Sequence, residues 1–474
     1  MMKMVGLRLL VILVFSLILT SASASNINTT IITTLPGYSG ELPFTLETGY
    51  VGVGDNEEVQ LFYYFIESQR NPGQDPLVLW LGAGPGCSGL AGVFFQSGPL
   101  SFKYVDYNGS LPTLQDNPFA WTQGLNIIYL DAPVGTGFSY STTQSGYVTN
   151  DYKYVAQTYE FLQKWLDAHP AFVENLLYIG GDSYSGMIVP MVVKQIVDGN
   201  ENGTVPLMNL KGYVLASPVT DSVIDVNSQI PFAHRLSLIS DQLYKAAKTS
   251  CNGEYVNVDS NNAACIADID AIERLVSDIN AFQILEPVCS NSLPTPKEIG
   301  TSGIYHKDLS RGLLSAAPKG AALWCRGYIY ELSYIWANSR GVQDALGVRR
   351  GTKTYWPYCN STLAFTEDVT SVVSYHQSLS KRADLRALIY SGDHDMAIPH
   401  IGTQEWINLL NLTVDEYWRT WSLDGQTAGY TKKLINEFFS LTFATVKGAG
   451  HIPGEYKIKE CAAMIDRWMA YYPL

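Results

Sequence analysis

The sequence predicts an α/β fold with a mostly parallel central sheet, helices on both faces and an inserted, mainly helical cap. Three observations predict it. Short apolar runs alternate with helical segments, a glycine-rich turn carrying a serine follows one of these runs, and the alternation stops after about residue 221 and resumes near residue 387. At 474 residues the chain is longer than one compact core usually is. We therefore expect a core in two parts, 25–221 and 353–474, with the cap in residues 222–352.

The first residues have the features of an export signal. Lys3 and Arg8 precede the apolar run 9–19, and a small-residue stretch with an Ala-x-Ala pattern ends near Ala24. The apolar run is short for a bilayer span, and the cleavage pattern argues against the alternative of a membrane anchor. We expect a signal peptide over 1–24 and passage through the secretory pathway, to the vacuole or the extracellular space, without membrane attachment after cleavage.

The core strands are expected where short apolar runs lack the spacing of an exposed helix. A helix is expected over 151–169, because its apolar side chains recur on one side and Pro170 follows its end. A closing helix is expected near 455–469. The expected strands, in chain order, cover residues 60–65, 77–81, 126–130, 176–179, 387–390 and 441–446.

Composition narrows the class of function. The formal net charge is −13 and no basic cluster is present, so the chain has no electrostatic footprint for nucleic acid. No C-x-x-C or H-E-x-x-H spacing occurs, so we expect no metal site. The seven cysteines fit an oxidising compartment, and because their number is odd, at least one stays free or pairs between chains. Five sequons predict glycosylation, at Asn28, Asn108, Asn202, Asn360 and Asn411.

The candidate nucleophile is Ser183. It lies in residues 180–186, Gly-Gly-Asp-Ser-Tyr-Ser-Gly, directly after an expected strand and directly before an apolar helix start at Met187. Small neighbours permit the tight strand-to-helix turn, and the helix N-terminus favours negative charge near the serine. Ser185 stands where the second glycine of G-x-S-x-G belongs, but it is small enough for the same turn.

The candidate acid and base follow later strands in the order that this kind of site requires. Asp393 and Asp395 follow the strand 387–390, and His451 follows the last strand. We assign Asp395, which lies beyond the turn, because an aspartate at the position of Asp393 more often caps the turn itself. Serine, acid and histidine in this chain order predict an α/β-hydrolase, with Ser183 as nucleophile, Asp395 as the orienting acid and His451 as general base.

An acyl-enzyme mechanism also needs backbone donors for the oxyanion. We expect the N–H of Tyr184 and, from the glycine-rich loop 82–86, the N–H of Gly84. A phosphate-binding loop is the alternative for 82–86, but Pro85 and the lack of the accompanying lysine and glycine spacing exclude it.

The ordered motifs resemble those of the serine carboxypeptidase family, across nearly all of the chain after residue 34. Within that family the chain looks most like the plant serine carboxypeptidase-like acyltransferases. The motifs that carry the family resemblance are 35–37, 85–88, 117–121 and 131–140 together with the loops around Ser183, Asp395 and His451, and those of the acyltransferases are 181–186, 390–396 and 424–430.

The resemblance implies a reaction and its partners. The acyltransferases move an acyl group from a 1-O-β-glucose ester to an alcohol or amine, in plant secondary metabolism and without a cofactor. A serine carboxypeptidase that releases C-terminal residues from peptides is the alternative. A non-catalytic protein on the same fold is a further one.

The choice between transfer and peptide hydrolysis concerns the site for the substrate carboxylate. The peptidases use an asparagine and two glutamates, and the matching positions here are Gly82, Gln96 and Asp182. Only Asp182 is acidic, so we expect no pair of carboxyl groups sharing a proton. Ala83 departs from the acyltransferase pattern of Thr-Gly at 82–83. We expect these four residues to line the substrate site.

The resemblance also implies the disulfides Cys87–Cys359, Cys251–Cys265 and Cys289–Cys325, which leave Cys461 as the odd thiol. The third bond spans the polar stretch 290–320, which is often excised in relatives. Excision here implies a mature protein of two disulfide-linked chains.

Overall fold

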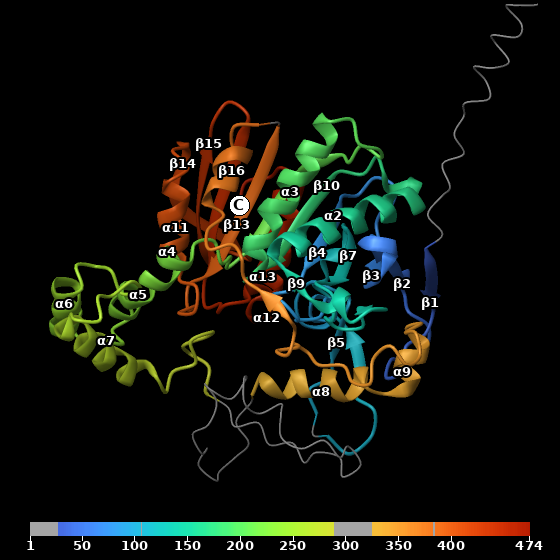
Figure 1. Cartoon of the computed structure of the whole chain (residues 1–474), viewed down its shortest axis with the longest axis horizontal. Helices are drawn as coiled ribbons and strands as arrows, with labels where there is room; N and C mark the ends of the chain where they lie inside the picture. The colour runs from blue at the N-terminus through green and yellow to red at the C-terminus, as the bar shows by residue number, and fades with distance from the viewer. Residues whose placement is uncertain (1–26, 106, 289–324, 383) are drawn as a thin grey trace, which may run out of the picture.

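A twelve-stranded mixed sheet forms the centre of the molecule in the computed structural model, which describes residues 27–105, 107–288, 325–382 and 384–474 (Figure 1). The strand order is β1-β2-β3-β7-β4-β10-β11-β13-β16-β15-β14, and β8 pairs with β3 at the side. The predicted signal peptide 1–24 and the stretch 290–320 lie outside the described residues. The strands are β1 Asn28–Ile32, β2 Leu46–Val53, β3 Val59–Ile66, β4 Leu77–Leu81, β7 Asn126–Asp131, β8 Tyr140–Ser141, β10 Leu177–Asp182, β11 Leu210–Ala216, β13 Leu385–Gly392, β14 Thr413–Leu423, β15 Gln426–Ile435 and β16 Phe439–Val446.

The six strands from β7 to β16 are mutually parallel, as the alternation of strands and helices predicts. Both edges of the sheet are antiparallel: β1, β2 and β3 lead into β7 on one side, and β15 and β14 follow β16 on the other. The sequence analysis predicted every parallel strand except β11 and, of the antiparallel ones, only β3. Small two-stranded sheets join β5 Leu100–Phe102 with β6 Leu114–Asp116 and β9 Thr149–Asn150 with β12 Phe365–Thr366.

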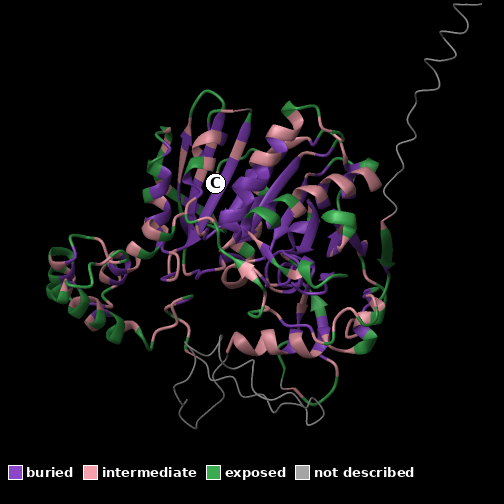
Figure 2. Ribbon diagram, in the orientation of Figure 1, coloured by how far each residue is buried: buried purple, intermediate pink, exposed green. Residues whose placement is uncertain are grey.

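Helices cover both faces of the sheet. Side chains on successive residues of a strand point to opposite faces, so Leu79 of β4 faces one core with α2 and α3, whereas Trp80 faces the other core with α13. In Figure 2 the buried strands, coloured purple, lie between the helices of the two faces. The helices of the core are α2 Asp151–Ala168, α3 Ser185–Glu201, α10 Val373–Leu379, α11 His400–Asn408, α12 Pro453–Tyr456 and α13 Ile458–Met469.

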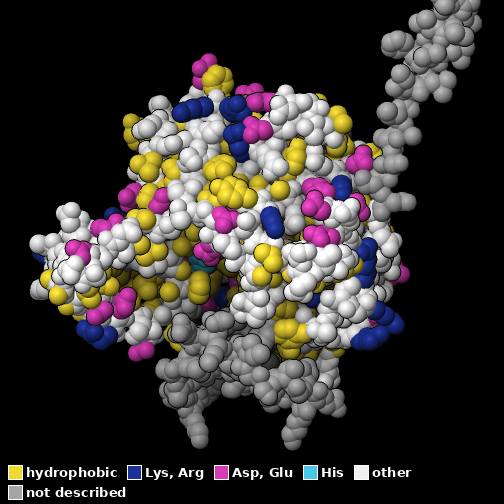
Figure 3. Space-filling model, viewed as in Figure 1, with side chains coloured by type: hydrophobic (Ala, Val, Ile, Leu, Met, Phe, Trp, Pro, Cys, Tyr) yellow, Lys and Arg dark blue, Asp and Glu magenta, His cyan; other side chains and the backbone are white. Residues whose placement is uncertain are grey.

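The region predicted as a cap leaves the sheet after β11, and its first part, residues 222–276, forms an arm at the side of the molecule, whereas its later helices, residues 327–345, pack against the body (Figure 1). The arm has a small apolar core of its own, and the Cys251–Cys265 disulfide joins two of its helices. A hollow lies between this arm and the body of the molecule in the space-filling view (Figure 3). The helices of this region are α4 Ser222–Asn227, α5 Gln229–Arg235, α6 Asp241–Ser250, α7 Ala263–Val276, α8 Gly327–Ala337 and α9 Arg340–Ala345.

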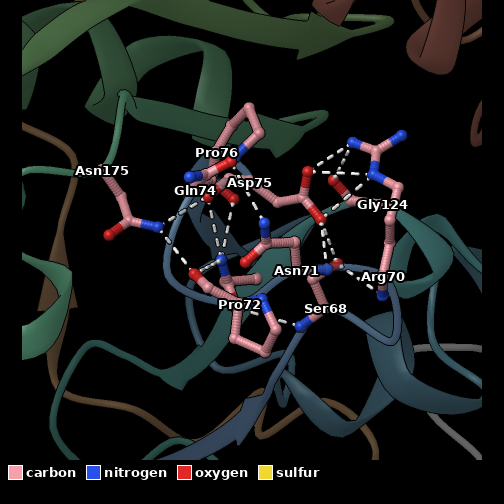
Figure 4. A network of polar contacts seen from close by, with 10 residues as sticks. Ser68, Arg70, Asn71, Pro72, Gln74, Asp75, Pro76, Gly124 and Asn175 are labelled. Atoms are coloured by element: carbon pink, nitrogen blue, oxygen red, sulfur yellow. Dashed lines mark hydrogen bonds and ion pairs between the residues drawn. The ribbon is translucent and has the colours of Figure 1, made fainter.

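A polar network fixes the ends where three of the parallel strands begin (Figure 4). Asn175 donates from Nδ2 to the carbonyls of Pro72 and Asp75, at 2.8 and 2.7 Å, and Asn126 at the start of β7 donates to the same two carbonyls at 2.9 Å. Arg70 forms an ion pair with the Asp75 carboxylate. The opposite, carboxyl ends of these strands are where an open parallel sheet carries its functional site.

The Cys87–Cys359 disulfide connects the two parts of the core, and Cys461 is a buried free thiol. The third implied bond involves Cys289, which lies outside the described residues. Four sequon asparagines are exposed, whereas Asn360 is half-buried and donates from Nδ2 to the Gly135 carbonyl at 3.1 Å. Among the helices of the described residues, none is both long and apolar enough to cross a membrane.

Candidate active site

Ser183 lies in a sharp turn between β10 and α3, with a positive φ of 54°. Small neighbours make this turn possible. A Cβ on Gly181 would lie 2.6 Å from Ser185 Cβ, and one on Gly186 would lie 2.4 Å from the carbonyl oxygen of Val219. The turn is fixed by the N–H of Ser183, which donates to the Ala216 carbonyl of β11 at 3.0 Å. A non-glycine residue held at positive φ is a feature of strained functional turns.

The structure brings Ser183, Asp395 and His451 together from three separate strand ends. His451 Nε2 lies 2.8 Å from Ser183 Oγ, and His451 Nδ1 lies 2.8 Å from Asp395 Oδ2. Asp395 is fully buried and His451 is 5 % exposed. The three side chains thus form an unbroken hydrogen-bonded chain from acid to base to nucleophile, the arrangement that activates a serine.

Asp395 and Asp393 have different surroundings. Asp395 Oδ1 accepts the N–H groups of Ala397 and Ile398, at 2.8 and 3.0 Å, which leaves Oδ2 to face His451. Asp393 Oδ1 instead accepts the N–H of Gly448, at 2.6 Å. Asp393 therefore ties the turn after β13 to the loop after β16, as an aspartate that caps a turn does.

The cap contributes directly to the surroundings of the histidine, which the sequence analysis did not anticipate. The N–H of His451 donates to the carbonyl of Phe282 at 2.7 Å, and the two rings lie 5.2 Å apart. Gln283 Nε2 donates to the carbonyl of Gly448 at 3.0 Å. Phe282 is 55 % exposed, so it offers an apolar surface to a ligand beside the imidazole.

Opposing effects set the pKa of His451. Burial lowers this pKa, but the charge of Asp395 and its hydrogen bond raise it, and Asp182 and Glu455 add to the rise, so that the net shift is upward from 6.5. A positive charge on the imidazole is therefore stabilised, as a base that accepts the serine proton requires.

The N–H groups of Tyr184 and Gly84, the predicted oxyanion donors, do not both face the same point in this conformation. The N–H of Tyr184 donates to the carbonyl of Ala83 at 2.6 Å, so the loop's own oxygen occupies the place of the oxyanion. The Ala83–Gly84 peptide is trans, and in a trans peptide the C=O and N–H point in opposite directions. The Gly84 N–H is therefore directed away from Tyr184.

The conformation of the loop 82–86 is set by its contacts with Ser185 and Cys87. Ser185 donates its hydroxyl to the Gly82 carbonyl, which holds the start of the loop against the serine turn. A Cβ on Gly82 would lie 2.6 Å from the carbonyl oxygen of Cys87, so no side chain fits at this position. The asparagine of the peptidases has no room in this arrangement of the loop.

Replacing Ala83 with Gly is expected to make the Ala83–Gly84 peptide easier to rotate, because glycine adopts φ and ψ values that alanine does not. We expect labelling of Ser183 by a fluorophosphonate to become about two- to fivefold faster, which corresponds to about 0.5–1 kcal/mol. Ala83→Val, with a stiffer side chain, should slow the same reaction. Equal labelling rates in the wild type and both variants would contradict a rate-limiting rotation of this peptide.

Two of the four predicted substrate-binding residues, Gln96 and Asp182, contact each other beside Ser183. Gln96 Nε2, from a π-helical turn at Gly92–Gln96, donates to Asp182 Oδ2 at 3.0 Å. Asp182 is fully buried, and its Oδ1 has no hydrogen-bond partner among the described residues. Burial, together with the charge of Glu455, raises the pKa of Asp182 to about 7.

Glu455 supplies a second carboxyl group, whose charge acts on Asp182, but no hydrogen bond joins the two carboxyl groups in the described part of the chain. It lies in α12, four residues after His451, and α12 packs against the π-helical turn that carries Gln96. Burial raises the pKa of Glu455, while Arg326, Tyr330 and Gln96 oppose that rise. No regular spacing in the sequence connects Glu455 with Asp182, because the two residues meet only through the packing of the last strand's loop.

Across the described part of the chain, no group of three histidine, cysteine or acidic side chains is arranged to hold a metal ion. The space-filling view shows hydrophobic side chains and a histidine within the hollow beside the arm (Figure 3). The site thus combines a serine, a buried acid–histidine pair and a polar cluster of two carboxyl groups with one amide. This set of groups is suited to acyl transfer through a serine ester.

Comparisons with known proteins match the chain to serine carboxypeptidases over most of its length. The sequence profile of the serine carboxypeptidase family matches residues 36–471. Serine carboxypeptidase-like 13 of Arabidopsis thaliana is 44 % identical over 445 residues, 94 % of each chain, and serine carboxypeptidase-like 10 of the same plant is 45 % identical over 444 residues, 94 % of this chain and 95 % of that one. The crystal structure of a prohormone-processing carboxypeptidase, Kex1(delta)p, from Saccharomyces cerevisiae has a TM-score of 0.69 at 17 % identity, over 90 % of this chain and 92 % of that one. That structure shares the fold.

Proposed function

The chain belongs to the serine carboxypeptidase family, and on that premise we propose that it is an acyltransferase, which moves an acyl group from a 1-O-β-glucose ester to an alcohol or amine acceptor. The family and the α/β-hydrolase fold are common to peptidases and transferases alike. The choice between them therefore depends on the residues around Ser183.

In the proposed reaction Ser183 Oγ attacks the ester carbonyl while His451 Nε2 takes the serine proton. The bond from the carbonyl carbon to the sugar oxygen then breaks, and His451 returns the proton to that oxygen, which leaves an acyl group on Ser183. The acceptor hydroxyl or amine next attacks the acyl-enzyme and gives its proton to His451. The bond from the acyl carbon to Ser183 Oγ then breaks, His451 gives its proton to that oxygen, and the new ester or amide leaves the restored enzyme.

Asp395 and the Ala83–Gly84 peptide assist the steps of this reaction. Asp395 holds the Nδ1 proton of His451, so that Nε2 stays available to the serine, and its charge stabilises the imidazolium. The Ala83–Gly84 peptide must turn over when substrate binds, because only then are the Tyr184 and Gly84 N–H groups free to stabilise the oxyanion. The binding energy of the substrate supplies the driving force for this rotation.

The observation that carries the proposal is the loss of the donors that a peptide C-terminus needs. Position 82 is a glycine with no room for a side chain, and the Gln96 amide already donates to Asp182. Asp182 Oδ1 and Glu455 Oε1 have no hydrogen-bond partner within the ranges that the structure describes. They are acceptors when ionised, and they suit hydroxyl groups.

One observation favours a serine carboxypeptidase instead. Asp182 and Glu455 both have raised pKa values, so under acidic conditions one or both can be protonated and donate to a peptide carboxylate. Peptide hydrolysis at low pH is therefore the second candidate function.

A pair of assays on the purified mature protein separates the two candidates. We expect transfer from one or more 1-O-acyl-β-glucoses to alcohol or amine acceptors. We expect kcat/KM for blocked dipeptides to be about 10- to 100-fold lower, because each lost hydrogen bond to a charged group is worth about 1.5–3 kcal/mol. Efficient dipeptide hydrolysis without transfer from any glucose ester would select the peptidase.

The proposed setting follows the sequence expectations. The partners are small molecules, an acyl-glucose and its acceptor, with no nucleic acid and no cofactor. The export signal and sequons support a glycoprotein of the secretory pathway, in the vacuole or outside the cell.

A further inference from the structure

Two buried acceptor oxygens lie unused beside the reacting groups. Asp182 Oδ1 and Glu455 Oε1 are buried, and neither has a hydrogen-bond partner among the residues that the structure describes. Asp182 directly precedes Ser183, and Glu455 lies four residues after His451 in α12, which packs against the π-helical turn that carries Gln96. Buried polar atoms without partners are costly, and native proteins keep them where a ligand or water completes the site.

The second oxygen of each carboxyl group is already held in place. Gln96 donates to Asp182 Oδ2 at 3.0 Å, and the Tyr330 hydroxyl donates to Glu455 Oε2 at 2.5 Å. Arg326 fixes the backbone at the same point, since its Nη1 donates to the Glu455 carbonyl at 2.9 Å. Each carboxyl group is therefore positioned by the protein through one oxygen and has the other left for a ligand.

We propose that Glu455 is a substrate-specificity residue which, together with Asp182, accepts hydrogen bonds from the sugar hydroxyls of the glucose ester. This inference rests on the proposed transferase function. A hydroxyl group both donates and accepts, so it pairs with a carboxyl group in either protonation state, whereas a carboxylate ligand pairs only with the protonated acid. A sugar held by Glu455 and Asp182 places its leaving oxygen beside His451, which must protonate it.

Glu455→Gln in the full mature chain tests the assignment. The variant keeps the side-chain size but replaces the carboxylate. We expect the KM for a 1-O-acyl-β-glucose to rise about tenfold or more, with a smaller fall in kcat. The loss in kcat/KM for the glucose ester should exceed the loss for p-nitrophenyl acetate, which has no sugar, by about tenfold or more.

Two further variants define the effect. Tyr330→Phe releases Glu455 Oε2, so it should change the KM for the glucose ester in the same direction and by less. Glu416→Gln is the matched control, because Glu416 is a partly exposed glutamate paired with Arg419 on the edge strand β14. This control should keep the wild-type constants for both substrates.

Three outcomes would overturn the assignment. Equal losses for the glucose ester and p-nitrophenyl acetate would mean that Glu455 acts through His451, and an unchanged KM would mean that Glu455 does not contact the sugar. A third experiment needs no turnover: it measures whether methyl β-D-glucopyranoside slows the labelling of Ser183 by a fluorophosphonate. Protection that is lost in Glu455→Gln supports the sugar site even if the protein proves to transfer no acyl group, and absence of protection in the wild type removes it.

Discussion

Asp395→Asn is expected to lower kcat about 10⁴-fold with little change in the fold. The N–H groups of Ala397 and Ile398 already require an oxygen at this position, so the asparagine oxygen will face them and its amide NH₂ will face His451 Nδ1. His451 must then accept at Nδ1 and carry its proton on Nε2. In that tautomer it cannot take the proton of Ser183.

The pH dependence gives a second readout for the same variant. Neutral His451 is the active base, so activity should fall as pH drops through the pKa of His451, which lies above 6.5 in the wild type. Asp395 is the strongest influence that raises this pKa, and its replacement should move the acidic limb of the residual activity to lower pH.

Asp393→Asn is the matched control, because it is the other acid of the same turn. Its oxygen can still accept the N–H of Gly448, so we expect kcat to fall less than about tenfold. A loss in Asp393→Asn as large as in Asp395→Asn would contradict our assignment of the acid.

Ser183→Ala is expected to remove activity almost completely, by about 10⁶-fold in kcat, because it removes the hydroxyl that faces His451 and forms the proposed acyl-enzyme. Labelling of the protein by a fluorophosphonate should disappear as well. Alanine at a φ of 54° costs little more than serine does, so the turn should persist and the variant should fold.

The neighbouring serine supplies the control for this experiment. Ser185→Ala removes the hydroxyl that holds the Gly82 carbonyl, but it leaves Ser183 and His451 in contact. We expect this variant to react with the fluorophosphonate. A protein that still takes the label after Ser183→Ala would show that another residue is the reactive nucleophile.

The parallel centre of the fold could be predicted because its strands are buried on both faces and are therefore apolar along their whole length. β4, Leu77–Leu81, is the clearest example. The edge strand β14, Thr413–Leu423, is exposed over most of its length and has no such run. A usable indication was present in Asp424-Gly425, which forms the tight turn to β15 with positive φ at both residues.

Some residues of the active site could likewise be predicted from the sequence, and others could not. The order of serine, acid and histidine along the chain is fixed by the order of strand ends, so the approximate positions of Ser183, Asp395 and His451 could be predicted. Glu455 could not, since it meets Gln96 only through the packing of α12 on the π-helical turn. The orientation of the Ala83–Gly84 peptide could not be predicted either, because it is set by contacts of the loop with Tyr184 and Ser185, which are distant in the sequence.

The strand order determines when, during synthesis of the chain, the active site can be complete. β11 pairs with β13 in the middle of the sheet. Ser183 lies on the side whose strands come earlier in the chain, whereas Asp395 and His451 follow β13 and β16, which are synthesised later. His451 follows β16, the final strand. On the proposed mechanism, a nascent chain cannot react with esters until His451 has been synthesised. Activity therefore begins only after all the described strands of the central sheet have been made and can pair.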